Sequence, residues 1–390
     1  MEILLIGGTG VLSSAVVQEA LTRGISVTLI NRGHRHSPDG VSLIVSDKDD
    51  YERISAALDC RKFDAVVDFL CMTDKDVANS FNLYSKYCNQ YVLISSCAVY
   101  NKDKPSIKDE NAPKVDSRWS YSVNKWAAEC RLKELSKDSS CATTVIRPSI
   151  TYGDTRIPYG VSPRYGCHWT MIARALAGKP ILRWNRGENF SNMLRVEDFA
   201  VGLVDLLGNP AAFGEAFNIC GDERPTYNDV LRAIENAIGH EVPVFDITPE
   251  FYAEELPERA GEILVGRAMD SWNSNEKIKR VSSRFHQTIF LEEGVFKTVE
   301  AYRKNKFQSG IDWYFDATTD RIIRRWCREH RDVCCPNQLK FRDYLGNASK
   351  HDWVTYHLIR GKGTFEEKFL RRCLSLRNKI NSFIGRFWNA

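Results

Sequence analysis

A tyrosine and a lysine stand four residues apart in WSYSVNKWAAE, residues 119–129. Side chains at positions i and i+4 lie on one face of a helix, about one turn apart. A phenol has a pKa of about 10, and an ammonium group one turn away would favour the phenolate and lower that pKa. Tyr121 and Lys125 could then serve proton transfer near neutral pH. A half-buried tyrosine beside a solvated lysine is the alternative for so short a motif, so the rest of the chain has to decide.

A glycine-rich turn follows the first apolar segment of the chain. EILLI, residues 2–6, precedes GGTG, and a helical pattern then runs from Ser14 to Thr22. Gly7 and Gly10 would allow a tight turn in which backbone N–H groups approach a pyrophosphate at the helix N-terminus. Ser13 stands where a third glycine is expected, and it is small enough for close helix–strand packing. Between a strand and a helix, this loop predicts a dinucleotide-binding site.

The end of the second strand, INRGHRH, bears on which dinucleotide binds. An NAD site usually has Asp or Glu there, which accepts a hydrogen bond from the ribose 2′-hydroxyl. Asn31, Arg32 and Arg35 are found instead, and arginine can pair with a 2′-phosphate. We therefore expect NAD or NADP, with NADP slightly favoured, although such arginines can also be simply solvated. Asp47, just past the third strand, is a candidate to bind the adenine amino group.

Apolar strands alternate with helical patterns along the first 155 residues. After the first strand, further apolar runs cover residues 25–30, 41–45, 64–70, 91–96 and 143–149. Continuous apolar strands that alternate with helices predict a parallel sheet covered on both faces. The expected fold class is α/β, a Rossmann-type doubly wound parallel sheet.

The character of the sequence changes after Gly153. A Gly- and Pro-rich loop covers 153–166, and later patterns predict helices near 168–177 and 196–208, a strand at 215–220, and a helix that begins at Thr226 and ends at Gly239. We divide the chain into three parts. Residues 1–155 form the NAD(P)-binding domain, to which 188–225 return; 156–305 form mainly a smaller, interleaved substrate domain; and 306–390 form a partly helical, basic extension.

The composition is that of an ordinary globular protein, with 43% hydrophobic and 27% charged residues. The net charge of +4 is mild and does not indicate a nucleic-acid partner. No apolar run reaches the roughly 18 residues of a membrane span, and the N-terminus lacks the basic region of a signal peptide. The twelve cysteines are scattered, and the Cys334-Cys335 pair has no metal-ligand spacing around it. We therefore expect a cytoplasmic protein with reduced thiols and no metal.

GGTGVLS, ISSCAVY and YSVNK occur in this order, and together they resemble the extended short-chain dehydrogenase/reductases. The branch they resemble is the NAD-dependent epimerase/dehydratase, or nucleotide-sugar, family, over residues 1 to about 300. The resemblance implies that Tyr121 is the catalytic acid/base, that Lys125 lowers its pKa and holds the nicotinamide ribose, and that Ser96 binds the reacting oxygen. The cofactor contacts that it implies are Gly7, Gly10, Val11, Leu12, Asn31, Arg32, Asp47, Phe69, Leu70, Tyr121, Lys125 and Pro148.

Departures from the family pattern narrow the reaction. The 4,6-dehydratases carry an Asp-Glu pair directly after the serine or threonine, where this chain has Cys97 and Ala98. Water elimination is therefore not expected. Epimerases commonly bind the substrate pyrophosphate with an arginine at a position that is Ser191 here, with Arg186 and Arg195 nearby but displaced.

Later in the chain, Arg267 could match the second phosphate-binding arginine or be a plain surface residue. The substrate contacts that we predict are Ser96, Cys97, Arg186 and Arg267. Asp198, in LRVEDFA, is expected to be structural.

Two functions remain open at this stage. The leading one is an NAD(P)-dependent epimerase or ketoreductase that acts on a hydroxyl or keto carbon of a nucleotide-activated sugar. The alternative is a short-chain-dehydrogenase-like protein that acts by binding a cofactor or RNA, as RNA-associated relatives in plastids do. The presence of Ser96, Tyr121 and Lys125 together favours the enzyme, because a binding protein does not need all three.

The last helical pattern, FEEKFLRRCLSLRNKINSFIGRFW, carries an apolar stripe among basic residues. The stripe comprises Phe369, Cys373, Leu376, Ile380, Phe383 and Phe387. A basic helix with aromatic residues can lie on an anionic membrane surface. We favour packing of the stripe on the domain or on a second subunit, and a homodimer is compatible with the family resemblance. Trp313, Tyr314 and Trp326 are expected to anchor the extension to the core.

Overall fold

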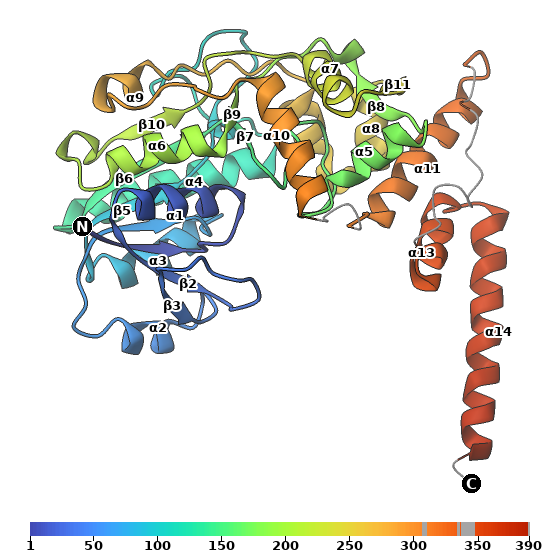
Figure 1. The fold of residues 1–390 in the computed structure, drawn as a ribbon, viewed down its shortest axis with the longest axis horizontal. Coiled ribbons are helices and arrows are strands. Elements are labelled where there is room, and N and C mark those ends of the chain that lie inside the picture. The colour runs from blue at the N-terminus through green and yellow to red at the C-terminus, as the bar shows by residue number, and fades with distance from the viewer. Residues whose placement is uncertain (306–309, 334–335, 337–347, 389–390) are drawn as a thin grey trace.

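The computed structural model describes residues 1–305, 310–333, 336 and 348–388, with side chains up to Leu376 in the last helix. A seven-stranded sheet forms the N-terminal body, in the order β10-β6-β5-β4-β1-β2-β3 (Figure 1). All of its neighbouring strands pair in parallel. The strands are β1 (Glu2–Ile6), β2 (Ser26–Asn31), β3 (Ser42–Val45), β4 (Phe63–Asp68), β5 (Cys88–Ile94), β6 (Ala142–Pro148) and β10 (Ala216–Ile219). The predicted Rossmann-type fold class is confirmed.

Helices cover both faces of this sheet, which is why its strands are continuously apolar. Along β1, Ile3 and Leu5 enter the core under one layer of helices, whereas Leu4 and Ile6 enter the core under the other. The first layer contains α1 (Val11–Thr22) and α6 (Val196–Leu206), and the second contains α2 (Tyr51–Ala57), α3 (Asp74–Tyr84) and α4 (Ser120–Leu135). The sequence analysis did not predict α3, although a capping box of Thr73 and Asp76 marks its start.

The second lobe is built from short strands and helices. Its strand pairs are β7 (Ile150–Tyr152) with β9 (Met193–Arg195), and β8 (Ile181–Trp184) with β11 (Val244–Ile247). Its helices are α5 (Trp169–Leu176), α7 (Tyr227–Ile238), α8 (Pro249–Glu255), a π-helix (Glu262–Arg267) and α10 (Leu291–Lys304). Helix α9 (Glu276–Val281) lies instead beside β10 of the main sheet, and its Ile278 is buried in the core of that sheet. As predicted, Thr226 caps α7 and Gly239 ends it in the left-handed conformation, at φ 66°.

Five single-turn 3₁₀ helices complete the main body. They are Cys97–Val99, Ser136–Asp138, Asn185–Gly187, Pro210–Ala212 and Pro257–Arg259. After β9 the chain returns to the main sheet. There α6 covers one face, and β10 pairs with β6 at the edge. Residues from both lobes therefore meet at the carboxyl ends of the strands, where open α/β sheets bind their ligands.

The C-terminal extension continues with α11 (Trp313–Glu329), α13 (Lys350–Arg360) and α14 (Phe365–Trp388). Ile322 and Ile323 of α11 are buried in the core of the second lobe, and the Trp326 ring meets Phe251 edge-on at 4.9 Å. Trp326 is thus an anchor, as expected. Tyr314 is not, because 57% of it is exposed. The expectation for Tyr314 was wrong because its side chain lies on the outer face of α11.

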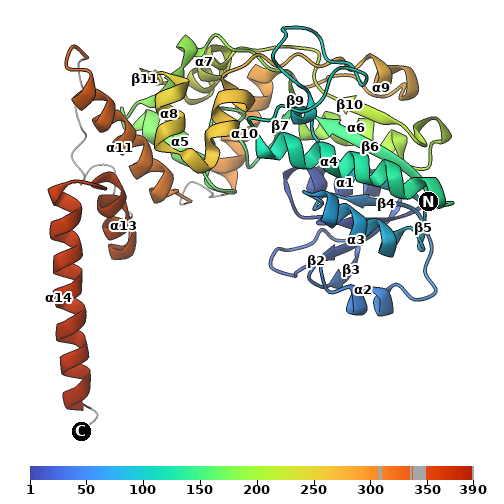
Figure 2. The same ribbon diagram turned by 180° about the vertical axis from the view of Figure 1, so that it is seen from behind.

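Helix α14 extends away from the rest of the chain (Figures 1 and 2). Phe369 is 56% exposed and Leu376 54% exposed, and Cys373 is exposed as well. The described part of the apolar stripe therefore does not pack on the chain's own body, contrary to one of the favoured expectations. The side chains of Ile380, Phe383 and Phe387 lie outside the described residues, as does the Cys334-Cys335 pair. Within the described part of the chain, no helix combines the length and apolarity needed to cross a bilayer.

Candidate active site

Helix α4 presents Tyr121, Lys125 and Glu129 one turn apart along its length. Lys125 is 3% exposed, and its Nζ donates to the carbonyl oxygens of Ile94 (3.0 Å) and Cys71 (2.6 Å). These two carbonyls lie just at or beyond the carboxyl ends of β5 and β4. Lys125 therefore ties α4 to the sheet, and Tyr121 lies one turn earlier at the edge where ligands bind.

Tyr121 lines a pocket of about 450 Å³ between the two lobes. The sequence-predicted residues Ser96, Cys97, Lys125 and Arg267 line the same pocket. On the side of the sheet, Leu12, Phe69 and Pro148 line it too, as the family resemblance implied for cofactor contacts. The structure thus brings these residues together from six separate segments of the chain, although the roles of these residues stay predictions.

The electrostatics of Tyr121 differ from the expectation. Burial raises the pKa of the Tyr121 phenol, while hydrogen bonding from Ser96 and the charges of Arg156 and Arg267 act to lower it. Burial also lowers the pKa of Lys125. Lys125 gives its hydrogen bonds to backbone carbonyls, and its Nζ stays 6.0 Å from the centre of the Tyr121 ring. In this structure the groups that oppose the effect of burial on the Tyr121 pKa are therefore Ser96 and two arginines rather than Lys125.

A buried network holds the segment that carries Ser96. The Ser95 hydroxyl donates to Glu129 (2.5 Å), and Glu129 forms a buried ion pair with Arg147 (2.6 Å). Arg147 also donates to the Tyr100 hydroxyl (2.8 Å). Because Glu129 lies two turns after Tyr121 on α4, this network fixes the Ser96 segment relative to the tyrosine.

Two of the predicted substrate contacts, Cys97 and Arg186, differ in whether they line the pocket. Cys97 lines the pocket, but its thiol donates to the carbonyl oxygen of Arg147 (3.1 Å), and burial raises the thiol pKa. Arg186 is exposed and is absent from the pocket lining. The expectation that Arg186 reaches the substrate is not met in this pocket, because its left-handed backbone (φ 53°) lies in a turn outside the pocket wall.

The residues that follow Arg186 in the chain, Ser191, Arg195 and Asp198, have defined positions in the structure. Ser191, at the position of the family's pyrophosphate arginine, does line the pocket. Arg195 is buried and paired with Asp154 and Glu197, so it is structural. Asp198 is structural too, as expected, because its carboxylate accepts from the backbone N–H groups of Thr288 (2.9 Å) and Ile289 (3.0 Å).

The glycine loop has the geometry that a dinucleotide needs. Gly7 is in the left-handed region at φ 88°, and a side chain there would collide with Leu70. The Ser13 hydroxyl accepts from the Gly10 N–H (2.8 Å) and donates to the Gly7 carbonyl (2.7 Å), so the serine in place of the third glycine braces the turn. Helix α1 begins at Val11, and its first N–H groups have no carbonyl of the same helix to donate to. These N–H groups are donors of the kind that bind a pyrophosphate at a helix N-terminus.

The adenosine end of the groove is shaped by the loop after β2. The Asn31 side chain accepts from the Gly33 N–H (2.7 Å) and closes the turn. Arg32 is exposed, whereas Arg35 donates to the Thr9 carbonyl of the glycine loop (2.8 Å) and lies over the Tyr165 ring at 3.9 Å. Of these two arginines, Arg35 is the one in contact with the glycine loop.

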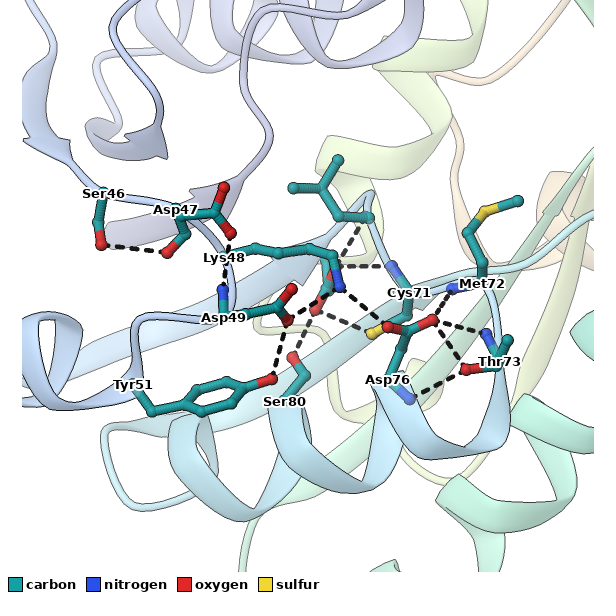
Figure 3. Close-up of polar contacts among 12 residues, drawn as sticks. Ser46, Asp47, Lys48, Asp49, Tyr51, Cys71, Met72, Thr73, Asp76 and Ser80 are labelled. Atoms are coloured by element: carbon teal, nitrogen blue, oxygen red, sulfur yellow. Dashed lines mark hydrogen bonds and ion pairs between the residues drawn. The ribbon is translucent and has the colours of Figure 1, made fainter.

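The loops after β3 and β4 are joined by a polar cluster (Figure 3). Lys48 pairs with Asp49 (3.0 Å) and Asp76 (2.9 Å), and although burial opposes the effect, its ammonium lowers the pKa of Asp76 to about 2. The Asp47 carboxylate accepts from the Asp49 N–H (3.1 Å), and the Asp47 side chain is exposed. Its carboxylate remains accessible for the adenine contact predicted from the sequence.

The sequence analysis missed several residues of the pocket. The Trp119 ring is tilted by 39° against the Tyr121 ring, with the ring centroids 5.3 Å apart, and Lys102, Arg156 and Glu262 line the wall around it. Lys102 directly follows the AVYN segment, and Arg156 lies in the Gly- and Pro-rich loop after β7, so both follow strands at their carboxyl ends. That position was the available signal. No group of three or more potential metal ligands occurs among the described residues.

Comparisons with known proteins identify the family of the chain. A family model for the NAD dependent epimerase/dehydratase family matches residues 3–220, more than half of the chain. The chain is 26% identical over 259 residues to the chloroplast stem-loop binding protein of 41 kDa b from Arabidopsis thaliana, covering 62% of this chain and 64% of that protein. It is 24% identical over 265 residues to a 2′-dehydrokanamycin reductase from Streptomyces kanamyceticus, covering 66% and 72%.

Solved structures show the same fold. A UDP-glucose 4-epimerase from Thermotoga maritima, with UDP-glucose, superimposes with a TM-score of 0.65 at 18% identity, over 78% of this chain and 100% of that one. A UDP-glucuronic acid 4-epimerase from Bacillus cereus, in complex with NAD, gives 0.63 at 17% identity, over 78% and 99%. At these identities the likeness concerns the fold.

Proposed function

Because the chain belongs to the NAD dependent epimerase/dehydratase family, we propose that it is an NAD(P)-dependent epimerase or ketoreductase of a nucleotide-activated sugar. The observation that carries the proposal is that Ser96, Tyr121 and Lys125 line one pocket at the carboxyl ends of the sheet strands. The buried ion pair of Glu129 and Arg147 links α4 to β6 and stabilises that arrangement. The epimerases and the reductase to which the chain is similar support the same class of reaction.

In the proposed reaction, Tyr121 takes the proton of a sugar hydroxyl, or returns it to a ketone oxygen. Ser96 donates a hydrogen bond to the same oxygen, where negative charge develops. Lys125 keeps α4 against the sheet through its two carbonyl contacts. A bound nicotinamide would supply the hydride acceptor or donor. Water elimination is not part of the proposal, because Cys97 and Ala98 provide neither the acid nor the base.

For the cofactor we propose NAD or NADP, with NADP slightly favoured. The arginines after β2 and the absence of an acid there support a 2′-phosphate, and Arg35 already reaches the glycine loop. Mass spectrometry of the small molecules released on denaturation tests this choice. An epimerase must return its hydride to the same substrate, so a co-purifying dinucleotide favours epimerisation, and a nucleotide sugar beside it identifies the substrate. An empty protein favours a reductase that exchanges its cofactor each turnover, or the binding-only alternative.

The test of the chemistry is Tyr121→Phe, assayed with UDP-, GDP-, CDP- and dTDP-sugars. Loss of the acid/base should lower turnover by about 10²- to 10⁴-fold without a change in melting temperature. Tyr84→Phe is the matched control, since it removes another buried hydroxyl that has no hydrogen-bonding partner in the described structure. If Tyr121→Phe leaves every activity unchanged, the enzyme proposal fails and the binding-only alternative takes its place. The similarity to the chloroplast stem-loop binding protein favours RNA as the next ligand to test.

A further inference from the structure

Besides Lys125, three cations line the pocket wall around Tyr121, and we call these three the pocket cations: Lys102, Arg156 and Arg267. They come from the segment after β5, the loop after β7 and the π-helix of the second lobe. Glu262 is the only carboxylate among the described residues that line this pocket. The wall therefore carries more positive charge than the protein neutralises.

The pocket cations have few partners within the protein. The Lys102 ammonium donates to the Val265 carbonyl (3.1 Å). Arg267 reaches Glu262 only at 3.3 Å, and its Nε is buried without a hydrogen-bonding partner among the described residues, although the Tyr227 hydroxyl lies nearby. The Arg156 guanidinium makes no hydrogen bond or ion pair with any described side chain. A half-buried charge with few partners is costly, so these groups are arranged for a ligand that supplies negative charge.

The charge of Arg267 acts on both of the other pocket cations. Burial and the Arg267 charge lower the pKa of Lys102 to about 8, against the smaller opposing effects of Asp116 and Asp270. Burial and Arg267 likewise lower the pKa of Arg156 to about 10, with Glu262 opposing. A bound anion would relieve both effects, because it favours the charged forms.

Two of the pocket cations act on the phenol that is expected to react. Arg156 and Arg267 are the cations whose charges act on Tyr121. Lys125, on the sheet side, is influenced instead by Asp68, Glu129 and Asp76 of the N-terminal domain. One or two arginines are enough to bind a substrate diphosphate. Arg156 and Lys102 add positive charge beyond that need, in the pocket that holds the group expected to react.

We propose that Lys102 and Arg156 form an anion-binding subsite beside Tyr121, so that the sugar of the substrate carries an acidic group, a carboxylate, near the reacting carbon. Arg267 remains for the diphosphate. The inference rests on the proposed function and deepens it from nucleotide sugars in general to acidic ones. A neutral sugar would leave the Arg156 guanidinium without a partner, and a charge-assisted bond to carboxylate is about twice as strong as a neutral one.

The experiment compares two ligands that differ by one carboxylate, UDP-glucuronate and UDP-glucose, by calorimetric titration of the full-length protein. The wild type should bind UDP-glucuronate at least about tenfold more tightly. Lys102→Gln and Arg156→Gln should each reduce that preference about fivefold or more, chiefly by weakening the acid. Arg267→Gln should weaken both ligands equally. Lys137→Gln, an exposed lysine outside the pocket, is the control and should change neither. Melting temperatures verify that each variant folds.

Equal affinity of the wild type for the two ligands overturns the inference and leaves the proposed function intact. Equal weakening of both ligands by Lys102→Gln and Arg156→Gln also overturns it, because the residues would then bind the diphosphate. If neither UDP-sugar binds, the pair glucuronic acid 1-phosphate and glucose 1-phosphate is titrated. A preference for the acid in that pair keeps the subsite while the nucleotide-sugar function fails, and no binding of any of the four overturns both.

Discussion

Cations cluster in two parts of the molecule, and the two clusters differ in the number of carboxylates beside them. At the junction of the second lobe and the extension, Arg174 and Lys179 meet Asp316 and Asp320, and we call these four residues the α5–α11 ion network. Arg174 pairs with Asp316 (2.5 Å) and Asp320 (2.9 Å), and Lys179 pairs with the same two carboxylates (2.8 and 2.7 Å). The two cations are matched by two anions. The pocket cations face a single carboxylate.

The difference separates a structural use of charge from a functional one. In a low-dielectric interior, charges are tolerated when they are paired and hydrogen-bonded. The α5–α11 ion network meets that condition within the protein, so it needs no ligand and instead anchors α11 to the second lobe. The pocket cations do not meet it, so their charge is available to a substrate. The balance of charge, rather than burial alone, distinguishes the two sites.

The largest effect is expected from breaking the balanced network. Asp316→Ala leaves Arg174 and Lys179 with one carboxylate, and should lower the free energy of unfolding by about 3–5 kcal/mol. Urea denaturation measures the loss. Asp103→Ala is the control, because its ion pair with Arg118 is more than half exposed and is worth less than about 1 kcal/mol. Equal losses in the two variants would mean that the network is no more important than a surface pair.

Acid should weaken the same network. Although burial opposes the effect, Arg174 and Lys179 lower the pKa of Asp320 to about 2, below its usual value near 4. The stability that Asp320 contributes is therefore complete above about pH 4 and is lost as the pH falls towards 2, an effect of order 1–3 kcal/mol. Denaturation of the wild type and of Asp320→Asn at pH 5, 4 and 3 isolates this contribution. The gap between the two proteins should narrow as the pH falls; a constant gap would contradict the assignment.

Removing charge from the unbalanced site should have the opposite sign. Arg156→Met deletes a half-buried positive charge that has no ion-pair partner among the described residues, so the free energy of unfolding should stay the same or rise by up to about 1 kcal/mol. Arg174→Met, the same change in the balanced network, should lower it by about 3–5 kcal/mol. Parallel urea titrations compare the two. A large loss of stability in Arg156→Met would show that this arginine is structural after all.

The smallest effect is expected at the end of the chain. Deleting residues 365–390 removes α14, whose Phe369 and Leu376 are more than half exposed, and should change the free energy of unfolding by about 0.5 kcal/mol or less. Deleting from Ser349 onwards should cost more, because it also removes Tyr356, whose hydroxyl donates to Asp320. Thermal melts of the two truncated proteins give the comparison. A large loss on the shorter deletion would mean that α14 packs against something in solution, such as a second copy of the chain.

Much of the fold could be predicted because its signals are local. The strands of the main sheet are apolar throughout, since both faces are covered, and Thr226 and Gly239 bound α7 through their own backbone preferences. The strands β7, β8, β9 and β11 have three or four residues each, too few to show a period. Helix α3 was missed even though Val77, Phe81 and Tyr84 follow a helical spacing and are buried. For α3, the helical spacing of apolar residues was therefore visible in the sequence.

The candidate site divides in a similar way. Tyr121 and Lys125 were found because their spacing lies within one helix, and Ser96 because its motif precedes that helix in order. Lys102 and Arg156 were missed because their position after strands was the available signal, and that position alone does not distinguish a pocket side chain from a solvated one. Arg186 was expected in the pocket for the same reason, since distance along the chain says little about which loop faces inward.

The sequence by itself determined the order of strands and helices, the glycine turn and the common face of Tyr121 and Lys125, because each depends on residues within a few positions of one another. Only the tertiary structure decided that Lys125 would donate to Cys71 and Ile94 rather than act on the phenol. It also decided that Lys102, Arg156 and Arg267 would gather around Tyr121 with one carboxylate among them. Burial and the distances between charges set protonation and affinity, and both arise only when distant segments of the chain meet.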